Sequence, residues 1–177
     1  MTLTTDFGTR DPFVGIVKGV VLGICPHARL VDLTHEVAPH DIAEAALALE
    51  VSTPYFPPGS VHLAVVDPGV GSDRRALAVR AAGHYFVGPD NGLFSFAFTA
   101  GEWAAVSLES AAYRLPSVSQ TFHGRDVFAP AAAHLAAGVA LERLGPRVTD
   151  PVRLPRPESC RHGNEVVGEV KIGRAHV

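Results

Sequence analysis

The sequence predicts an α/β layer fold. Short β-like runs alternate with helix-like runs along the first part of the chain, a pattern typical of that class. The run at residues 61–66 is almost continuously apolar and has the length of a strand, as expected for a strand covered on both faces of a sheet. The 177 residues are 47% hydrophobic and 19% charged, which is enough apolar material for one sizeable core.

The strands of this fold are expected to be short. Residues 3–5 form the first and residues 29–33 the second, and residues 61–66 form the buried one. Two further strands are expected at residues 76–80 and 85–87, before a turn at Pro89-Asp90-Asn91-Gly92, whose residue types favour turns.

Three helices are expected between and after these strands. The first covers residues 12–23, with Asp11 as its N-cap and a proline in its first turn. The second begins at Asp41, has one apolar face, and ends at Pro54. The third covers residues 128–137, where a proline is tolerated in the first turn and a glycine follows the last.

The character of the chain changes after residue 145. Four prolines fall between residues 146 and 157, which predicts an extended linker over residues 146–165. One isolated β-like run follows. The last seven residues, 171–177, match one translated frame of a common sequencing adapter, so we expect that they are not native and that the reading frame was interrupted.

Composition excludes several classes of function. The net charge is −3 and the basic residues are scattered, which argues against a nucleic-acid partner. The longest apolar stretch, residues 13–25, is too short for a membrane span and contains Lys18, and no export segment is recognised, so we expect a soluble, cytoplasmic protein. Cys25 and Cys160 have no partner in metal-ligand spacing and suggest neither a disulfide framework nor a zinc site.

Polar residues that directly follow strands are the first candidates for a site, because ligands of open α/β sheets bind outside the carboxyl ends of the strands. Asp6 leaves the first strand and could grip a ribose diol, or it could be an ordinary turn aspartate. Asp67 and Arg74 could orient a water molecule at a small pocket, or they could stabilise a tight turn as an ion pair. His123 precedes a helix and could point into a cleft, or it could be a structural histidine.

A metal site is a weaker possibility. His35, His40 and His123 could combine with Asp6, Asp67 and Asp126, but no two of these residues show the paired spacing of a known zinc or iron motif. The glycine-containing loop after residue 66 lacks the third glycine and the Lys-Ser/Thr pair of a phosphate loop.

Taken together, five segments resemble one family. They are LTTDFGT at 3–9, VDLTHE at 31–36, AVVDPGVG at 64–71, PDNGLF at 89–94 and TFHGRD at 121–126. In this order they look like the S-adenosyl-L-methionine hydroxide adenosyltransferases, which are related to fluorinase and chlorinase. The resemblance covers most of residues 1–145 and implies a three-layer α/β/α sandwich with a mostly parallel central sheet.

The resemblance also implies a reaction: hydrolysis of S-adenosyl-L-methionine to adenosine and L-methionine, by in-line attack of water at C5′ of the ribose. The water would be held by Asp67, Arg74 and His123, a trio that the halogenating relatives lack. Asp6 matches the residue that grips the ribose hydroxyls. The remaining substrate-binding residues implied are Asp11, Phe122 and Gly124, the last through its backbone amide. No metal and no cofactor are implied, since S-adenosyl-L-methionine is the substrate.

The resemblance stops short of the family's full pattern. Family members continue through a proline-bearing linker into a smaller β-rich domain that supplies most adenine contacts, and they assemble as homotrimers. Residues 1–145 match the N-terminal catalytic domain, and residues 166–170 resemble the first strand of the missing domain. We therefore expect little or no turnover from this chain by itself. Alternative functions are a non-catalytic nucleoside-binding module, a metal-assisted hydrolase and an S-adenosyl-L-methionine-dependent halogenase.

Overall fold

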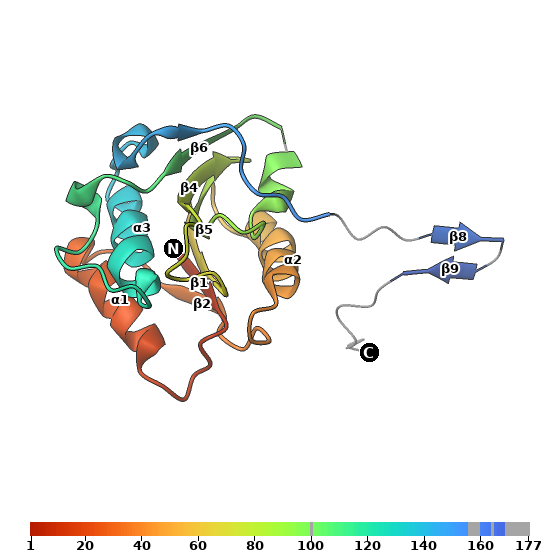
Figure 1. The fold of residues 1–177 in the computed structure, drawn as a ribbon, viewed down its shortest axis with the longest axis horizontal. Helices are drawn as coiled ribbons and strands as arrows, with labels where there is room; N and C mark the ends of the chain where they lie inside the picture. Colours follow the sequence, from red (N-terminus) through yellow and green to blue (C-terminus); the bar gives the residue numbers. More distant parts are fainter. Residues whose placement is uncertain (100, 156–159, 164, 169–177) are drawn as a thin grey trace.

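The fold is built on one mixed seven-stranded sheet (Figure 1). The computed structural model describes residues 1–99, 101–155, 160–163 and 165–168. The strand order is β2-β1-β3-β5-β4-β6-β7. The strands are β1 (Thr2–Thr5), β2 (Val31–Thr34), β3 (Val61–Val65), β4 (Ala76–Ala81), β5 (His84–Pro89), β6 (Trp103–Ser107) and β7 (Arg147–Val148).

Strand direction divides the sheet into two halves. Neighbours β2, β1, β3 and β5 are parallel, whereas β4, β6 and β7 are each antiparallel to the strand before them in the sheet. Because β6 then points the same way as the first four strands, most strands run in one direction. The expected mostly parallel sheet is confirmed in this sense, with an antiparallel edge that the sequence did not predict.

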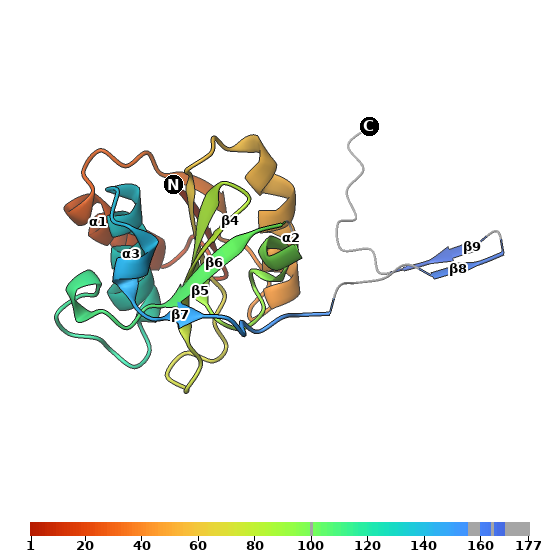
Figure 2. The same ribbon diagram turned by 90° about the horizontal axis from the view of Figure 1, so that it is seen from above.

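Helices cover both faces of the sheet and complete the expected three layers (Figures 1 and 2). Helices α1 (Phe13–Ile24) and α3 (Ala129–Ala136) pack on one face, and α2 (Ile42–Ser52) packs on the other. Five shorter helical segments complete the described chain: η1 (Thr53–Tyr55), η2 (Ser95–Thr99), η3 (Ala111–Tyr113), the π-helical turn η4 (Gly124–Phe128) and η5 (Leu141–Leu144). None of the helices in the described part of the chain is long and apolar enough to cross a membrane.

Strand β3 shows why the core has two parts. Leu63 and Val65 belong to the cluster under α1 and α3, whereas Ala64 and Val66 belong to the cluster under α2. Alternate side chains of a strand point to opposite faces, so a strand buried on both sides is apolar at nearly every position, in β3 at all but His62. The continuous apolar run predicted this correctly.

The helix starts agree with the prediction only in part. Asp41 caps α2, its side chain accepting a hydrogen bond from the Glu44 amide at 2.8 Å. The expected N-cap role of Asp11 is wrong, because α1 begins at Phe13 and the residue before it is Pro12, with no side-chain cap. Asp11 lies one position too early for its side chain to reach the first free amides of the helix.

The segment expected to be a linker is partly docked on the domain. β7 pairs with β6 at the edge of the sheet, and the chain continues to Pro155 along the same side of the domain (Figure 2). Beyond it, β8 (Cys160–His162) and β9 (Glu165–Val167) form a separate antiparallel pair. The expected strand at 166–170 thus overlaps β9, while its last two residues and the suspected adapter tail, 171–177, lie outside the described residues.

Candidate functional site

A cavity of about 320 Å³ opens at the carboxyl ends of β1 and β3. Asp6 follows β1 and Asp67 follows β3, and both line the cavity. The parallel strands β1 and β3 are neighbours, so their ends lie side by side. This is the edge at which open α/β sheets bind ligands, as the sequence predicted.

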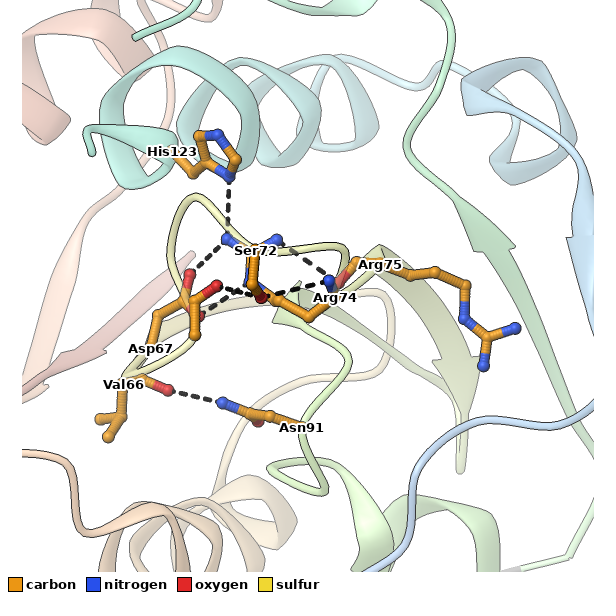
Figure 3. Close-up of polar contacts among 8 residues, drawn as sticks. Val66, Asp67, Ser72, Arg74, Arg75, Asn91 and His123 are labelled. Atoms are coloured by element: carbon orange, nitrogen blue, oxygen red, sulfur yellow. Dashed lines mark hydrogen bonds and ion pairs between the residues drawn. The ribbon is translucent and has the colours of Figure 1, made fainter. Parts of the chain in front are cut away.

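The structure brings Asp67, Arg74 and His123 together (Figure 3). Arg74 Nε donates to Asp67 Oδ1 at 2.8 Å, and Arg74 Nη2 donates to Asp67 Oδ2, so the ion pair is bidentate. The same Nη2 lies 2.8 Å from His123 Nδ1. The side chains of Asp67 and Arg74 are only 6% and 10% exposed, so separating the two would leave a buried charge without its partner.

The contact with Arg74 fixes the state of His123. A guanidinium has donors and no acceptor, so Nδ1 of His123 accepts and the proton of the neutral ring is on Nε2. Burial lowers the pKa of His123 and the positive charge of Arg74 lowers it further, while the carboxylate of Asp67 opposes them. His123 is therefore held in its neutral form.

The loop between Asp67 and Arg74 is shaped by short-range contacts. Ser72 Oγ donates to the Gly69 carbonyl at 2.6 Å and accepts from the Arg74 amide at 3.3 Å. Gly71 has φ +80°, and a Cβ there would lie 3.0 Å from the Gln120 carbonyl oxygen. A glycine is needed at this position to return the chain so that Arg74 faces Asp67.

Asp67 is the member of the trio that lines the cavity, and Arg74 and His123 lie behind it. Each carboxylate oxygen can accept more than one hydrogen bond, so Asp67 keeps acceptor capacity after binding Arg74. The arrangement is therefore able to orient a small polar molecule, such as water, at the cavity wall.

Asp6 is held by the loop before α2. The amide of His40 donates to Asp6 Oδ2 at 3.0 Å, and His40 has the left-handed backbone conformation, φ 67°. Both residues line the cavity. The backbone strain at His40 is thus associated with the orientation of a cavity carboxylate.

Aromatic side chains form an apolar wall, which the sequence reasoning identified only at Phe122. Phe7 and Phe13 meet edge to face with ring centroids 6.3 Å apart, and Phe13 meets Phe122 at 5.6 Å. Gly124 also lines the cavity, and a Cβ there would be 3.3 Å from the Phe7 ring. Arg125, which lies over Phe122 at 5.0 Å, was missed because no sequence pattern marks such stacking.

The remaining candidates lie elsewhere. Asp11 is exposed and does not line the cavity. His35 bonds Thr5 through Nδ1 at 2.8 Å and lies 3.0 Å from Asp32. Buried Asp126 accepts from Arg125 and from the Ser119 amide. Burial alone would raise the pKa of Asp126, but these contacts hold it below its usual value.

These contacts bear on the metal alternative. Among residues 1–99, 101–155, 160–163 and 165–168, no group of three or more His, Cys, Asp or Glu side chains is placed to hold a metal ion. Of the six side chains that the sequence offered as possible ligands, Asp67 and His123 are joined through Arg74, and Asp6 binds the His40 amide. His35 and Asp126 have other hydrogen-bond partners.

Known proteins resemble this chain along most of its length. It is 48% identical over 161 residues to the (R)-S-adenosyl-L-methionine hydrolase of Salinispora arenicola, a match covering 89% of this chain and 61% of the relative. It is 29% identical to the fluorinase of an Actinoplanes species, over 87% of this chain and 60% of that protein. A crystal structure of an uncharacterized conserved protein from Thermotoga maritima superposes with a TM-score of 0.91 and 38% identity, covering 97% of this chain and 66% of that one.

The chain therefore spans about three-fifths of the length of the curated relative it matches at 48% identity. The family described as SAM hydroxide adenosyltransferase N-terminal domain matches residues 1–145, the part that contains the sheet up to β6 and the whole cavity. The chain belongs to the SAM hydroxide adenosyltransferase family, and residues 1–145 are its N-terminal domain.

Proposed function

We propose that the protein containing this chain hydrolyses S-adenosyl-L-methionine to adenosine and L-methionine. The observation that carries the proposal is the hydrogen-bonded trio of Asp67, Arg74 and His123 at the wall of the cavity. The relatives named as (R)-S-adenosyl-L-methionine hydrolases support the choice of substrate.

The chemistry needs an oriented water more than an acid. In the reaction, the water oxygen forms a bond to C5′ while the C5′–S bond breaks. The electron pair of the C5′–S bond stays on sulfur, which becomes the neutral thioether of methionine, and the attacking water loses one proton to solvent. A sulfonium leaves without protonation, so the protein's main task is to align water opposite the C5′–S bond. We assign the hydrogen-bond acceptor for this water to Asp67, because it is the trio member that lines the cavity.

In this scheme, Arg74 orients the Asp67 carboxylate and His123 orients Arg74. The bidentate guanidinium fixes the plane of the carboxylate, and its positive charge stabilises the negative charge that develops on the attacking oxygen. His123 accepts from Nη2 and keeps Arg74 in that orientation.

The part of the cavity lined by Asp6 suits the ribose. Asp6 lines it with one oxygen held by the His40 amide, and a carboxylate can accept two hydrogen bonds from a vicinal diol. Phe122 and Gly124 complete the wall near the reacting carbon, and the aromatic rings keep bulk water from the site. We assign no substrate contact to Asp11, which is exposed and does not line the cavity.

The proposal includes no metal and no cofactor. It also includes assembly as a homotrimer, in which residues beyond this chain complete the adenine end of the site, and a cytoplasmic location. Because the chain covers 61% of the Salinispora arenicola relative, assays should use both this chain and a longer protein that contains it and has the length of that relative.

The decisive experiment is the Asp67→Ala variant of that longer protein. We expect the unaltered protein to release adenosine and methionine in equal amounts in the presence of chelator, and the variant to lose at least about 10²-fold in kcat, as when one preorganised polar group is removed from a site. Adenosine and methionine are quantified by chromatography after incubation with S-adenosyl-L-methionine.

Asp73→Ala is the matched control, because Asp73 lies in the same loop, is exposed and does not line the cavity. It should retain full activity. Unchanged turnover in Asp67→Ala, or turnover that requires chloride or fluoride, would contradict the proposed water chemistry. Calorimetric binding of adenosine without any turnover would instead favour the nucleoside-binding alternative, and loss of activity with chelator the metal-assisted one.

A further inference from the structure

A second set of polar contacts lies directly behind the Asp67–Arg74 pair. It is formed by Arg75, Asp90 and Asn91, which we call the brace, and none of the three lines the cavity. Arg75 directly precedes β4, and Asp90 directly follows β5, so the brace sits at the open end of the β4–β5 hairpin. Figure 3 shows Arg75 and Asn91 on two sides of the pair.

Asn91 holds the backbone that leads into Asp67. Its Nδ2 donates to the carbonyl oxygen of Val66 at 2.8 Å, and its Oδ1 accepts from the Leu93 amide at 3.2 Å (Figure 3). The second contact fixes the side chain within its own turn. The first therefore anchors the peptide unit between Val66 and Asp67, on which the direction of the Asp67 carboxylate depends.

Arg75 holds the other partner of the pair. Its carbonyl oxygen accepts from the Asp90 amide at 2.9 Å and from Arg74 Nη1 at 3.4 Å. Together with Asp67 and His123, this carbonyl gives the planar Arg74 guanidinium a third contact. A planar group held along three edges has little freedom to rotate.

Asp90 closes the brace. Its side chain is 2% exposed, and both oxygens are used: Oδ2 accepts from Arg75 Nε at 2.7 Å and Oδ1 from the Val152 amide at 2.8 Å. The rest of the Arg75 guanidinium donates to the side chain and the backbone of Asp150, each at 2.7 Å. A buried carboxylate with this many partners is a rigid point, because any shift would leave a charged oxygen without a donor.

We infer that Asn91 and Arg75 are positioning residues for the water-holding trio, acting through Asp67 and Arg74 respectively. The expected effect on kcat rests on the proposed hydrolysis. The expected effect on the positions of Asp67 and Arg74 rests on the geometry alone. Neither residue touches the cavity, so neither should affect substrate binding. Their removal should misalign the attacking water, and small errors in alignment reduce the rate of such reactions strongly.

The first test is Asn91→Ser. A serine can still accept from the Leu93 amide and preserve the turn, but it is too short to reach the Val66 carbonyl. We expect kcat to fall roughly tenfold while KM stays within about twofold of the original value. A defect that only loosened the fold would change both constants and lower the melting temperature.

The second test is Arg75→Gln, with Arg80→Gln as its matched control. Arg80 lies near the other end of β4, the strand that Arg75 precedes, and it pairs only loosely with exposed Glu142, at 4.0 Å. We expect Arg75→Gln to lower kcat in the same way as Asn91→Ser and Arg80→Gln to leave it unchanged.

A readout that needs no turnover is the titration of His123, followed by NMR on the 177-residue chain. The groups that face His123 are Arg74, Asp67, Arg114 and Asp126. Burial and then the charge of Arg74 lower the pKa of His123, so displacement of Arg74 in Arg75→Gln should let that pKa rise. No change is expected in Arg80→Gln.

The two proposals fail in distinguishable ways. If the unaltered protein does not cleave S-adenosyl-L-methionine, the proposed function fails, and the titration of His123 still decides whether the brace positions Arg74. If the unaltered protein is active, the brace is overturned by parallel changes in kcat and KM in Asn91→Ser, or by a His123 titration in Arg75→Gln that equals the original.

Discussion

At His123, one hydrogen bond sets the chemical role of the ring. Nδ1 accepts from Arg74, so the neutral histidine orients the arginine and does not itself present a free Nδ1 lone pair to a substrate. Protonation would place a second positive charge against Arg74 and break the bond. Because burial and Arg74 both lower the pKa of His123, the trio should stay intact in mildly acidic solution.

Another histidine makes the stability of the fold depend on pH. His62 is fully buried at the opposite end of the sheet, where Nδ1 lies 2.8 Å from the Thr2 hydroxyl and Nε2 lies 3.2 Å from His84 Nδ1. Burial, with the nearby positive charge of His84 as a smaller cause, lowers the pKa of His62 to about 4. The unfolded chain therefore binds more protons than the folded one between that pKa and the ordinary histidine pKa of about 6.5.

We predict that the free energy of unfolding falls as the pH is lowered through 6.5 toward 4, by on the order of 3 kcal/mol from His62. Above the ordinary pKa this contribution is fully present. Urea titrations at a series of pH values measure it. In His62→Gln the difference between neutral and acidic pH should shrink by that amount. An equal pH dependence in both proteins would show that folding does not lower the pKa of His62.

The residue types that do the chemistry were more predictable than those that support them. Aspartate, arginine and histidine at strand ends are a recognisable pattern, and the structure places Asp67, Arg74 and His123 in contact. Phe13 gave no such signal, because an apolar residue at a helix start usually belongs to the core. The contact between Asn91 and the Val66 carbonyl depends on the register between β3 and β5, which are not consecutive in the chain. The sequence does not specify that register.

At the scale of elements, the five strands predicted up to residue 87 are all present as β1 to β5, whereas β6 and β7 were not predicted. β6 has the sequence WAAVS, whose alanines carry little strand preference, so no strand was predicted there. β4 is inserted between β5 and β6 and runs against both. Short turns favour such a hairpin, but they do not tell which side of β5 it occupies.

The contact between β3 and β5 depends on Gly88. A Cβ at this position would lie 2.2 Å from the Ala64 carbonyl oxygen and 3.0 Å from the Phe94 ring. We predict that Gly88→Ala lowers the free energy of unfolding by about 3 kcal/mol, because two buried strands would have to separate. Chemical denaturation of the 177-residue chain measures the change.

Gly15→Ala is the control for Gly88→Ala. Gly15 lies in α1, and a Cβ there meets nothing within 4 Å. Alanine is the better helix former, so this variant should be more stable by about 0.5–1 kcal/mol. Unchanged stability in Gly88→Ala would show that the backbone moves to accommodate the methyl group, and a loss in Gly15→Ala would show that the helix surface at Gly15 does not tolerate one.

At the scale of the whole molecule, residues 147–154 act as a strap across the β5–β4–β6 side of the domain. β7 pairs with β6, and Asp150 pairs with Arg75. Arg153 lies over the rings of Phe98 and Trp103, at 5.5 and 5.8 Å. The four prolines predicted an extended backbone for this segment, and that is correct. Proline is also tolerated in the edge strands of a sheet, so the same residues fit a segment that docks at the sheet edge.

We therefore predict that a chain ending at residue 145 is less stable than one ending at residue 155. Loss of the strap exposes the edge of β6 and leaves buried Asp90 without the Val152 amide. The melting temperature should fall by at least about 4 °C, which corresponds to roughly 2 kcal/mol in a domain of this size. Equal melting temperatures would mean that the strap rests on the domain without stabilising it.

The cavity is assembled from parts that are made at very different times. A ribosome delivers the chain from its N-terminus, and β1, β2 and β3 can pair as soon as they have emerged. Phe122, Gly124 and the turn η4, which complete the cavity wall beside Asp6 and Asp67, are synthesised later. A nascent chain shorter than this carries the carboxylates but no pocket, so a partly synthesised protein has no finished site in which to bind a small molecule.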